Sequence, residues 1–303
     1  MGPRQQWRGF FTSYSTVAIT LPSQKMQKNS DYQYQSGKVV LYLYRQTHKY
    51  NKMVTDKKWR VLPNPPIVLA LFQVKFKQEA LDTVMVKRIE KRIMEKFPIC
   101  ATHHQSNFSI SSPLQVGQQT LKANTSTKVV GYTYSTKDQK VKINIEQGTV
   151  TYHDERKYEG WENFILCIRE FLDLMSPLIS ESLIHRVSIR FINKFVLPDF
   201  NNPLEYTNVI VSSSQNADLA YPVSKYAFRL FHDIPDTHIK SWVNHSLDNI
   251  DGKLNYMFDI DVLDHQNIVY NEETIIDILE NLRIVKNNIF FETLTDKTLD
   301  LCY

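Results

Sequence analysis

The chain has 303 residues, of which 42% are hydrophobic and 22% charged, so it is long enough for one large globular domain or two small ones. It contains only 8 glycines and 3 widely spaced cysteines, which argues against a glycine-rich phosphate loop, a disulfide framework and a cysteine zinc site. No apolar run approaches the roughly 20 residues of a membrane helix. We therefore expect a cytoplasmic protein in a reducing compartment, with no cofactor and no membrane partner.

The net charge of +4 is distributed unevenly along the chain. Residues 1–60 contain 11 Lys or Arg and 2 Asp or Glu, a balance of +9, whereas the rest contains 25 and 30, a balance of −5. Residues 1–57 show no sustained period, and only Val39 to Tyr44 resembles a strand. This segment is either a basic arm that contacts nucleic acid or an acidic surface, or an extension absent from a natural protein that begins at Met53. The second interpretation is favoured, because a regular pattern starts directly afterwards.

The regular pattern of elements starts near residue 58. The prolines of Leu62–Pro66 predict an extended segment, because each proline fixes its own φ and moves the preceding residue out of the helical region. A strand is predicted at 67–76, where apolar and polar residues alternate, and an amphipathic helix at 80–96. Further strands are predicted at 106–116, 129–135, 139–146 and 149–153, with a tight turn at Gln147-Gly148, and a helix at 160–179.

The same order of elements then starts again. A strand is predicted at 187–195, followed by a loop-like segment at 198–220 with a short helix after Pro203. The final helix is predicted at 272–291, with Asn271 as its N-cap. Between the loop and this helix, alternating patterns predict strands at 223–234, 238–245 and 254–263.

Together these elements predict an α+β fold in which helices cover one face of an antiparallel sheet. Residues 58–303 would form two tandem β-α-β(3–4)-α units, at about 58–180 and 181–303, although the first helix of the second unit has only a weak pattern. Residues 1–57 would form a separate, irregular extension. The element order resembles the repeat of the TATA-binding-protein-like fold, which by itself carries little functional weight.

Three short strings of residues resemble a known family. They are Leu62-Pro63-Asn64-Pro65-Pro66-Ile67-Val68, the core Arg190-Phe191-Ile192-Asn193, and the ending Asn288-Ile289-Phe290-Phe291-Glu292-Thr293-Leu294-Thr295-Asp296. They resemble an uncharacterised, sporadically distributed family of prokaryotic proteins that opens with Asn-Pro-Pro-Ile-Val, and the resemblance covers roughly residues 58–303. Leu69 departs from the pattern, since members commonly have an acidic residue there. The family has no established activity, so the resemblance implies no catalytic residues, and its patchy distribution resembles that of mobile or defence-linked genes.

A stripe of basic residues falls on outward positions of the predicted strands. If these strands form one sheet, the stripe would make a basic face suited to phosphate backbones, and Trp242 could stack on a base. The alternative is that it is the ordinary polar face of an antiparallel sheet. The candidate nucleic-acid-binding residues are Lys75, Lys77, Lys140, Lys142, Arg186, Arg190, Lys194, Arg229, Lys240 and Trp242, with Lys225 at the start of its strand.

Acidic residues and histidines suggest a weaker metal site. Asp233, Asp236 and His238 cluster in a predicted hairpin turn, and Asp259 and Asp261 share the polar face of one strand. Such groups could hold a hard divalent metal, although solvated turns use the same residues. His103-His104 is expected in a surface loop, and His153-Asp154-Glu155 is expected to be a polar turn although it could supply a general base and an orienting carboxylate.

No catalytic motif commits the chain to a chemistry, since it contains no GxGxxG, P-loop, GxSxG or HExxH pattern. The leading hypothesis is therefore a non-enzymatic protein-interaction or binding module that engages a protein partner or associates with itself. The alternatives are a nucleic-acid-binding protein that uses the basic sheet face and a metal-dependent hydrolase that uses the acidic clusters.

Overall fold

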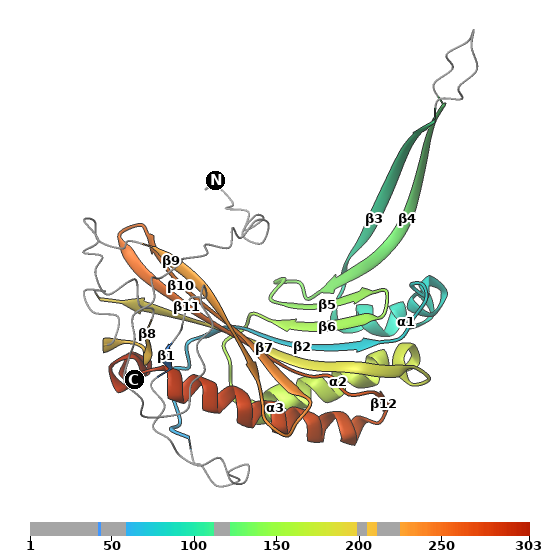
Figure 1. Cartoon of the computed structure of the whole chain (residues 1–303). Coiled ribbons are helices and arrows are strands. Elements are labelled where there is room, and N and C mark those ends of the chain that lie inside the picture. Colours follow the sequence, from blue (N-terminus) through green and yellow to red (C-terminus); the bar gives the residue numbers. More distant parts are fainter. Residues whose placement is uncertain (1–41, 44–58, 112–121, 199–204, 211–224) are drawn as a thin grey trace, which may run out of the picture.

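One large antiparallel sheet with helices on one of its faces makes up the protein, which is a mixed α+β fold as the sequence predicts (Figure 1). The computed structural model describes residues 42–43, 59–111, 122–198, 205–210 and 225–303. The strands of the sheet run in the order β3-β4-β5-β6-β2-β7-β11-β10-β9, and β12 pairs with β7. They are β2 (Ile67–Phe76), β3 (Ile99–Ser111), β4 (Lys122–Ser135), β5 (Val141–Glu146), β6 (Thr149–Asp154), β7 (Leu183–Leu197), β9 (Tyr226–Asp233), β10 (Ile239–Ile250), β11 (Lys253–Asp264) and β12 (Ile268–Val269).

Three long helices lie against the same side of this sheet (Figure 1). They are α1 (Thr83–Lys96), α2 (Trp161–Ile179) and α3 (Glu272–Thr293), and α4 (Asp296–Leu299) and a final 3-10 turn (Asp300–Cys302) follow them. A separate pair of two-residue strands joins β1 (Tyr42–Leu43) to β8 (Val209–Ile210). No helix in the described ranges is both long enough and apolar enough to cross a bilayer.

The centre of the sheet is the antiparallel pair β2 and β7. On its other side, β2 pairs with β6, the last strand of the β3–β6 meander, and β7 likewise pairs with β11, the last strand of the β9–β11 meander. The pair β2 and β7 therefore joins the β3–β6 meander to the β9–β11 meander. The internal duplication, the domain limits and the likeness to the TATA-binding-protein-like fold stay predictions.

The core fills the space between the sheet and the helices. Phe72 of β2 and Ile189 of β7 lie directly opposite each other and are fully buried. The ring of Phe72 meets Phe171 of α2 edge-on, with 5.8 Å between the ring centroids. In the second half, Phe258 of β11 stacks on Phe290 of α3 at 6.0 Å. Such aromatic pairs add to the free energy that burial alone contributes.

Capping residues set the starts of two helices. The Asp82 carboxylate accepts a hydrogen bond from the Met85 N–H, so α1 begins at Thr83 and not at residue 80. Asn271 accepts from the Thr274 N–H, which confirms its predicted role at the start of α3. Gly148 adopts a φ of 61° in the predicted turn between β5 and β6, where an added Cβ would lie 2.7 Å from the Phe76 carbonyl oxygen.

The structure differs from the prediction mainly in the lengths of three strands, β3, β4 and β10, of which β4 begins at Lys122 and not at residue 129. β3 begins at Ile99 and not at residue 106, so His103 and His104 lie in a strand and not in a surface loop. From Ile99 to Ser106 its polar residues do not alternate with apolar ones, and pairing with β4 decides the conformation of this part. β10 extends to Ile250, where the left-handed pair Asp251-Gly252 turns the chain into β11. Most of the predicted loop at 198–220 lies outside the described residues.

Replacing Phe72 by Ala should lower the free energy of unfolding by about 3–5 kcal/mol, because it leaves a cavity between the central strands and α2. Val84→Ala on the exposed face of α1, where the side chain is 63% exposed, is the control and should change it by less than about 0.5 kcal/mol. Urea titration of both variants measures the difference. Equal effects would contradict this assignment of the core.

The buried state of His245 in β10 allows a second test of the core. Its side chain is 1% exposed and stacks on Phe228 and Phe258. Burial lowers its pKa to about 3, and His232 adds repulsion. The folded state thus binds fewer protons than the unfolded state between pH 3 and about pH 6.5, so stability should fall as pH drops through this window. His245→Phe should reduce the slope of unfolding free energy against pH by about 1.4 kcal/mol per unit. An unchanged slope would contradict the neutral buried state.

Candidate functional site

The face of the sheet that points away from α1, α2 and α3, here called the outer face, is polar. Alternation along each strand puts the fully buried residues on the helix side and the charged residues on the outer face. One row of neighbours crosses seven strands of this face. It runs Lys142, His153, Leu71, Arg190, Asp261, Trp242 and Phe231.

The structure brings most of the predicted basic residues onto this outer face. Lys77 and Lys140 lie just beyond the ends of β2 and β5, and Lys225 lies just before β9. The other members of the stripe occupy strand positions of the expected face: Lys75, Lys142, Arg186, Arg190, Lys194, Arg229, Lys240 and Trp242. Five residues of the stripe pair with carboxylates, as Arg190–Asp259, Arg186–Asp261, Lys240–Asp233, Lys142–Glu155 and Lys225–Asp248.

The strongest of these pairs is part of a network across four strands. Asp259 receives two hydrogen bonds from Arg190, at 2.8 and 2.7 Å, which raise the pKa of the guanidinium. The Asn244 amide donates to the same carboxylate at 2.8 Å and accepts from Arg229 at 2.5 Å. The network holds β7, β11, β10 and β9 together and leaves the Arg190 charge compensated by its own chain.

Trp242 is also occupied within the fold. The Arg186 guanidinium lies over its ring at 5.2 Å, and Phe231 meets the ring edge-on at 6.3 Å. Burial lowers the pKa of Arg186, and burial raises the pKa of Asp261, its partner at 3.5 Å. A base that stacked on Trp242 would have to compete with these contacts.

The residues predicted as metal ligands lie in two separate places. Asp233, Asp236 and His238 lie at the β9–β10 turn, whereas Asp259 and Asp261 lie along β11. The three aspartates in strands bind cations of the chain itself, as described above. In the part of the chain that the structure covers, no three His, Cys, Asp or Glu side chains are grouped so as to hold a metal ion.

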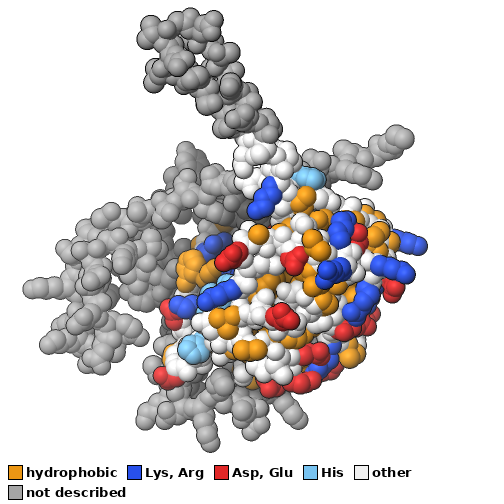
Figure 2. All heavy atoms as spheres, turned by 90° about the vertical axis from the view of Figure 1, so that its right-hand side faces the viewer, with side chains coloured by type: hydrophobic (Ala, Val, Ile, Leu, Met, Phe, Trp, Pro, Cys, Tyr) orange, Lys and Arg blue, Asp and Glu red, His pale blue; other side chains and the backbone are white. Residues whose placement is uncertain are grey.

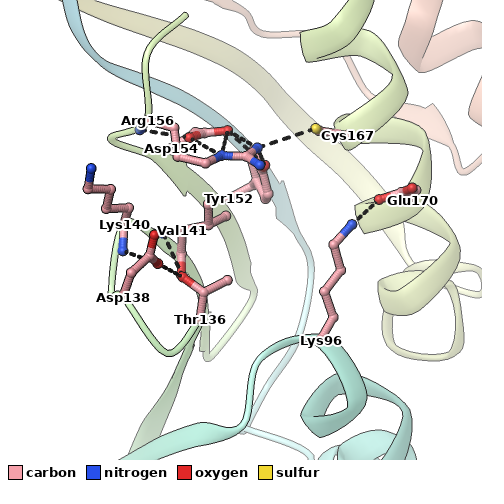
Figure 3. Close-up of polar contacts among 10 residues, drawn as sticks. All are labelled: Lys96, Thr136, Asp138, Lys140, Val141, Tyr152, Asp154, Arg156, Cys167 and Glu170. Atoms are coloured by element: carbon pink, nitrogen blue, oxygen red, sulfur yellow. Dashed lines mark hydrogen bonds and ion pairs between the residues drawn. The ribbon is translucent and has the colours of Figure 1, made fainter.

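The His153-Asp154 pair divides between the two faces of the sheet. His153 contacts the Asn144 amide on the outer face at 3.1 Å, and burial lowers its pKa to about 4. Asp154 points the other way, where Arg156 binds it through both Nε and Nη2 beside Cys167 of α2 (Figure 3). The two side chains therefore do not form a base with its orienting carboxylate. The same view shows Lys96 of α1 paired with Glu170 of α2.

The least protected part of the sheet is its edge at β3. Across the described residues, β3 pairs only with β4, and β4 pairs with β5 only from Gly131 onward. From His104 outward the two strands therefore extend from the body as a hairpin (Figure 1). Side chains on both faces of β3 are exposed from Ile99 to Asn107.

The composition of β3 is unusual for an edge strand. Its 13 residues, Ile99–Ser111, include no Lys, Arg, Asp, Glu or Pro, which are the residues that normally block the addition of a further strand. Figure 2 shows the described base of the hairpin as largely uncharged, with Lys and Arg side chains on the body below it. The other edge strand, β9, has 8 residues and carries Arg229 and Asp233.

A cavity of about 570 Å³ lies on the helix side of the molecule. Its walls come from the extended segment before β2, the residues that lead into α2, Asn193 of β7, and α3. Lys286 of α3 lies in this wall, with its ammonium 4.5 Å from the centre of the Phe191 ring.

Sequence reasoning missed both the β3 edge and Lys286. A signal for Lys286 was present, because it follows Leu279 by seven residues and Leu282 by four, and so falls on the apolar stripe of its helix. A signal for β3 was present in the uncharged stretch Ile99–Ser111. The edge position and the length of β3 do not follow from local pattern, because both depend on how β3 and β4 pair within the whole sheet.

Arg190→Met should destabilise the protein by about 3 kcal/mol, because it leaves the Asp259 carboxylate buried with only Asn244 as a partner. The double variant Arg190→Met with Asp259→Leu should recover most of this loss. Lys142→Met, which breaks the more exposed pair with Glu155, is the control and should cost about 0–1 kcal/mol. Denaturant unfolding measures all three, and a single variant no worse than the control would contradict the network's role.

Comparisons with known proteins assign no family and no function to the chain. No family model matches the chain, and neither a curated protein nor a solved structure matches it significantly.

Proposed function

We propose that the protein is a non-enzymatic protein-binding module that takes up an extended segment of another polypeptide along the edge of β3. The observation that carries the proposal is the uncharged edge strand Ile99–Ser111, whose side chains are exposed from Ile99 to Asn107. An edge strand offers a row of backbone N–H and C=O groups that a further strand can pair with. Main-chain hydrogen bonds would supply the affinity, and alternate side chains would supply the selectivity.

The projecting hairpin supports this function on energetic grounds. A two-stranded hairpin is marginally stable in water, whereas three strands are more stable. The pairs from His104–Val129 outward have no third strand among the described residues. A partner strand beside β3 would provide it. Replacing water by a polypeptide along β3 costs little desolvation free energy, because β3 has no charged side chain that would lose its hydration.

The alternative functions find less support in the geometry. The arginines of the outer face are compensated by Asp259 and Asp261, which weakens the attraction of that face for phosphate. The same carboxylates bind guanidinium groups, which leaves them less able to bind a metal.

The test places a photo-crosslinking amino acid at Ser106, an exposed β3 position, and expresses the protein in cells of its source. We expect a crosslink to a polypeptide. Irradiation of the purified protein alone distinguishes a second copy of the chain, which would crosslink there too, from a different protein, which would not.

Two matched variants give the test its specificity. Gln105→Glu with Asn107→Glu adds charges to β3, and Glu at 105 would face Lys128 across the hairpin, so the hairpin itself should persist. The crosslink should fall by about tenfold or more, the equivalent of about 1.4 kcal/mol. Ala227→Glu on β9, the other edge, should leave it unchanged. An undiminished crosslink in the double variant, or none in the original protein, would refute the proposal.

A further inference from the structure

The cavity on the helix side brings together three segments that are far apart in sequence. Asn193 of β7 and Phe290 and Phe291 of α3 line it together with residues of the proline-rich segment, which are Leu62, Pro63, Pro65, Pro66 and Ile67. These residues belong to the three strings singled out in the sequence. They meet at one place because Pro65 and Pro66 hold an extended segment against α3, while the Asn64 N–H donates to the Cys302 carbonyl at 3.0 Å.

The cavity lining is largely aromatic and apolar. Ion pairs and a hydrogen bond hold the C-terminal residues of the chain against its rim. Trp161 and Phe290 line the cavity and are 6% and 7% exposed. Arg60 on its rim binds Asp296 at 3.2 Å and Asp300 at 2.9 Å, and the Tyr303 hydroxyl donates to the Val61 carbonyl. A volume of about 570 Å³ lies within the usual range of small-molecule sites, roughly 300–1,000 Å³.

The Trp59 indole N–H in this lining has no hydrogen-bond partner among the described residues, and the same is true of two polar groups beside the Phe191 ring. One is the Lys286 ammonium, whose contact is the Phe191 ring at 4.5 Å. The other is the Tyr158 hydroxyl, whose ring packs edge-on against the same Phe191 at 5.7 Å. Lys286 is half-buried, and a cation–π contact compensates the loss of hydration of its ammonium only in part, so the group lacks the anion that a desolvated charge normally has.

The charges around the cavity favour an anion. Its lining contains Arg60, Lys157, Arg283 and Lys286 against Glu159 as the single acidic residue. Arg60 and Arg283 are paired with carboxylates outside the lining, Arg283 with Glu280 at 3.3 Å, whereas Lys157 and Lys286 have no acidic partner within the described chain. Burial lowers the pKa of Lys286 to about 7, with repulsion from Arg283, so an anion beside it would remove a cost that the free protein bears.

We propose that this cavity is a binding site for a small aromatic acid, with its anionic group on Lys286 and Tyr158 and its ring among Trp161, Phe290 and the prolines. The ammonium forms a charge-assisted hydrogen bond with the acid, and the tyrosine hydroxyl donates a second one. A ligand ring packed against the apolar walls would displace water from beside both bonds and so strengthen them. This site lies on the helix side of the sheet and does not rest on strand addition at β3.

The test is a fluorescence titration of the full chain with two probes of similar shape. 8-Anilinonaphthalene-1-sulfonate is an aromatic anion, and N-phenyl-1-naphthylamine is its neutral counterpart. The anion should bind one site per chain and at least about tenfold more tightly than the neutral probe, because only the anion pairs with Lys286. This comparison uses the unaltered protein, so it decides the matter even if a variant fails to fold.

The matched variants then locate the site. Lys286→Met keeps the length of the side chain and removes its charge, and it should weaken binding of the anionic probe about ten- to a hundredfold while leaving the neutral probe unchanged. Lys253→Met, at an exposed lysine of the β10–β11 turn, should bind both probes as the original protein does. Absence of binding, equal affinity for both probes, or an anion affinity unaffected by Lys286→Met would each overturn the proposal.

Discussion

The antiparallel pairing of β2 with β7 is the constraint on which the rest of the structure depends. These strands join two meanders into one sheet, and their helix-side residues, such as Phe72 and Ile189, are completely buried. Because side chains alternate along a strand, this single register decides which residues of every neighbouring strand face the helices and which face outward. A slip of one residue would move Arg186 and Arg190 into the core.

The same register explains why several basic residues of the outer face are paired with carboxylates of the chain itself. It places Arg190 opposite Asp261 and beside Asp259, so the fold neutralises this arginine internally. Outward charges on adjacent strands thus stabilise the sheet instead of remaining available to a partner. Unsatisfied groups that a ligand could reach lie at the β3 edge and in the cavity around Lys286, and a ligand that paired with them there would lower the free energy.

Much of the fold could be predicted from local pattern, because its central elements obey simple periodicities. The bounds of β2 and the Asn271 cap of α3 are as expected, since an alternating run and an N-cap are local signals. The candidate site could be predicted only in part. Alternation placed Arg190 and Asp259 on one face, but their hydrogen bonds depend on the β7–β11 register, which no local pattern shows. The exposed edge of β3 likewise depends on the strand order of the whole sheet.

Hydrogen exchange of individual backbone amides in the isolated protein tests whether the edge of β3 is open, because protection reports whether each N–H has a partner. We expect that β3 amides pointing away from β4, between Ile99 and Asn107, exchange rapidly, while amides of β7 exchange slowly because strands flank it on both sides. Slow exchange of every β3 amide in the monomeric protein would mean that the edge is already occupied. That result would contradict strand addition as the function of β3.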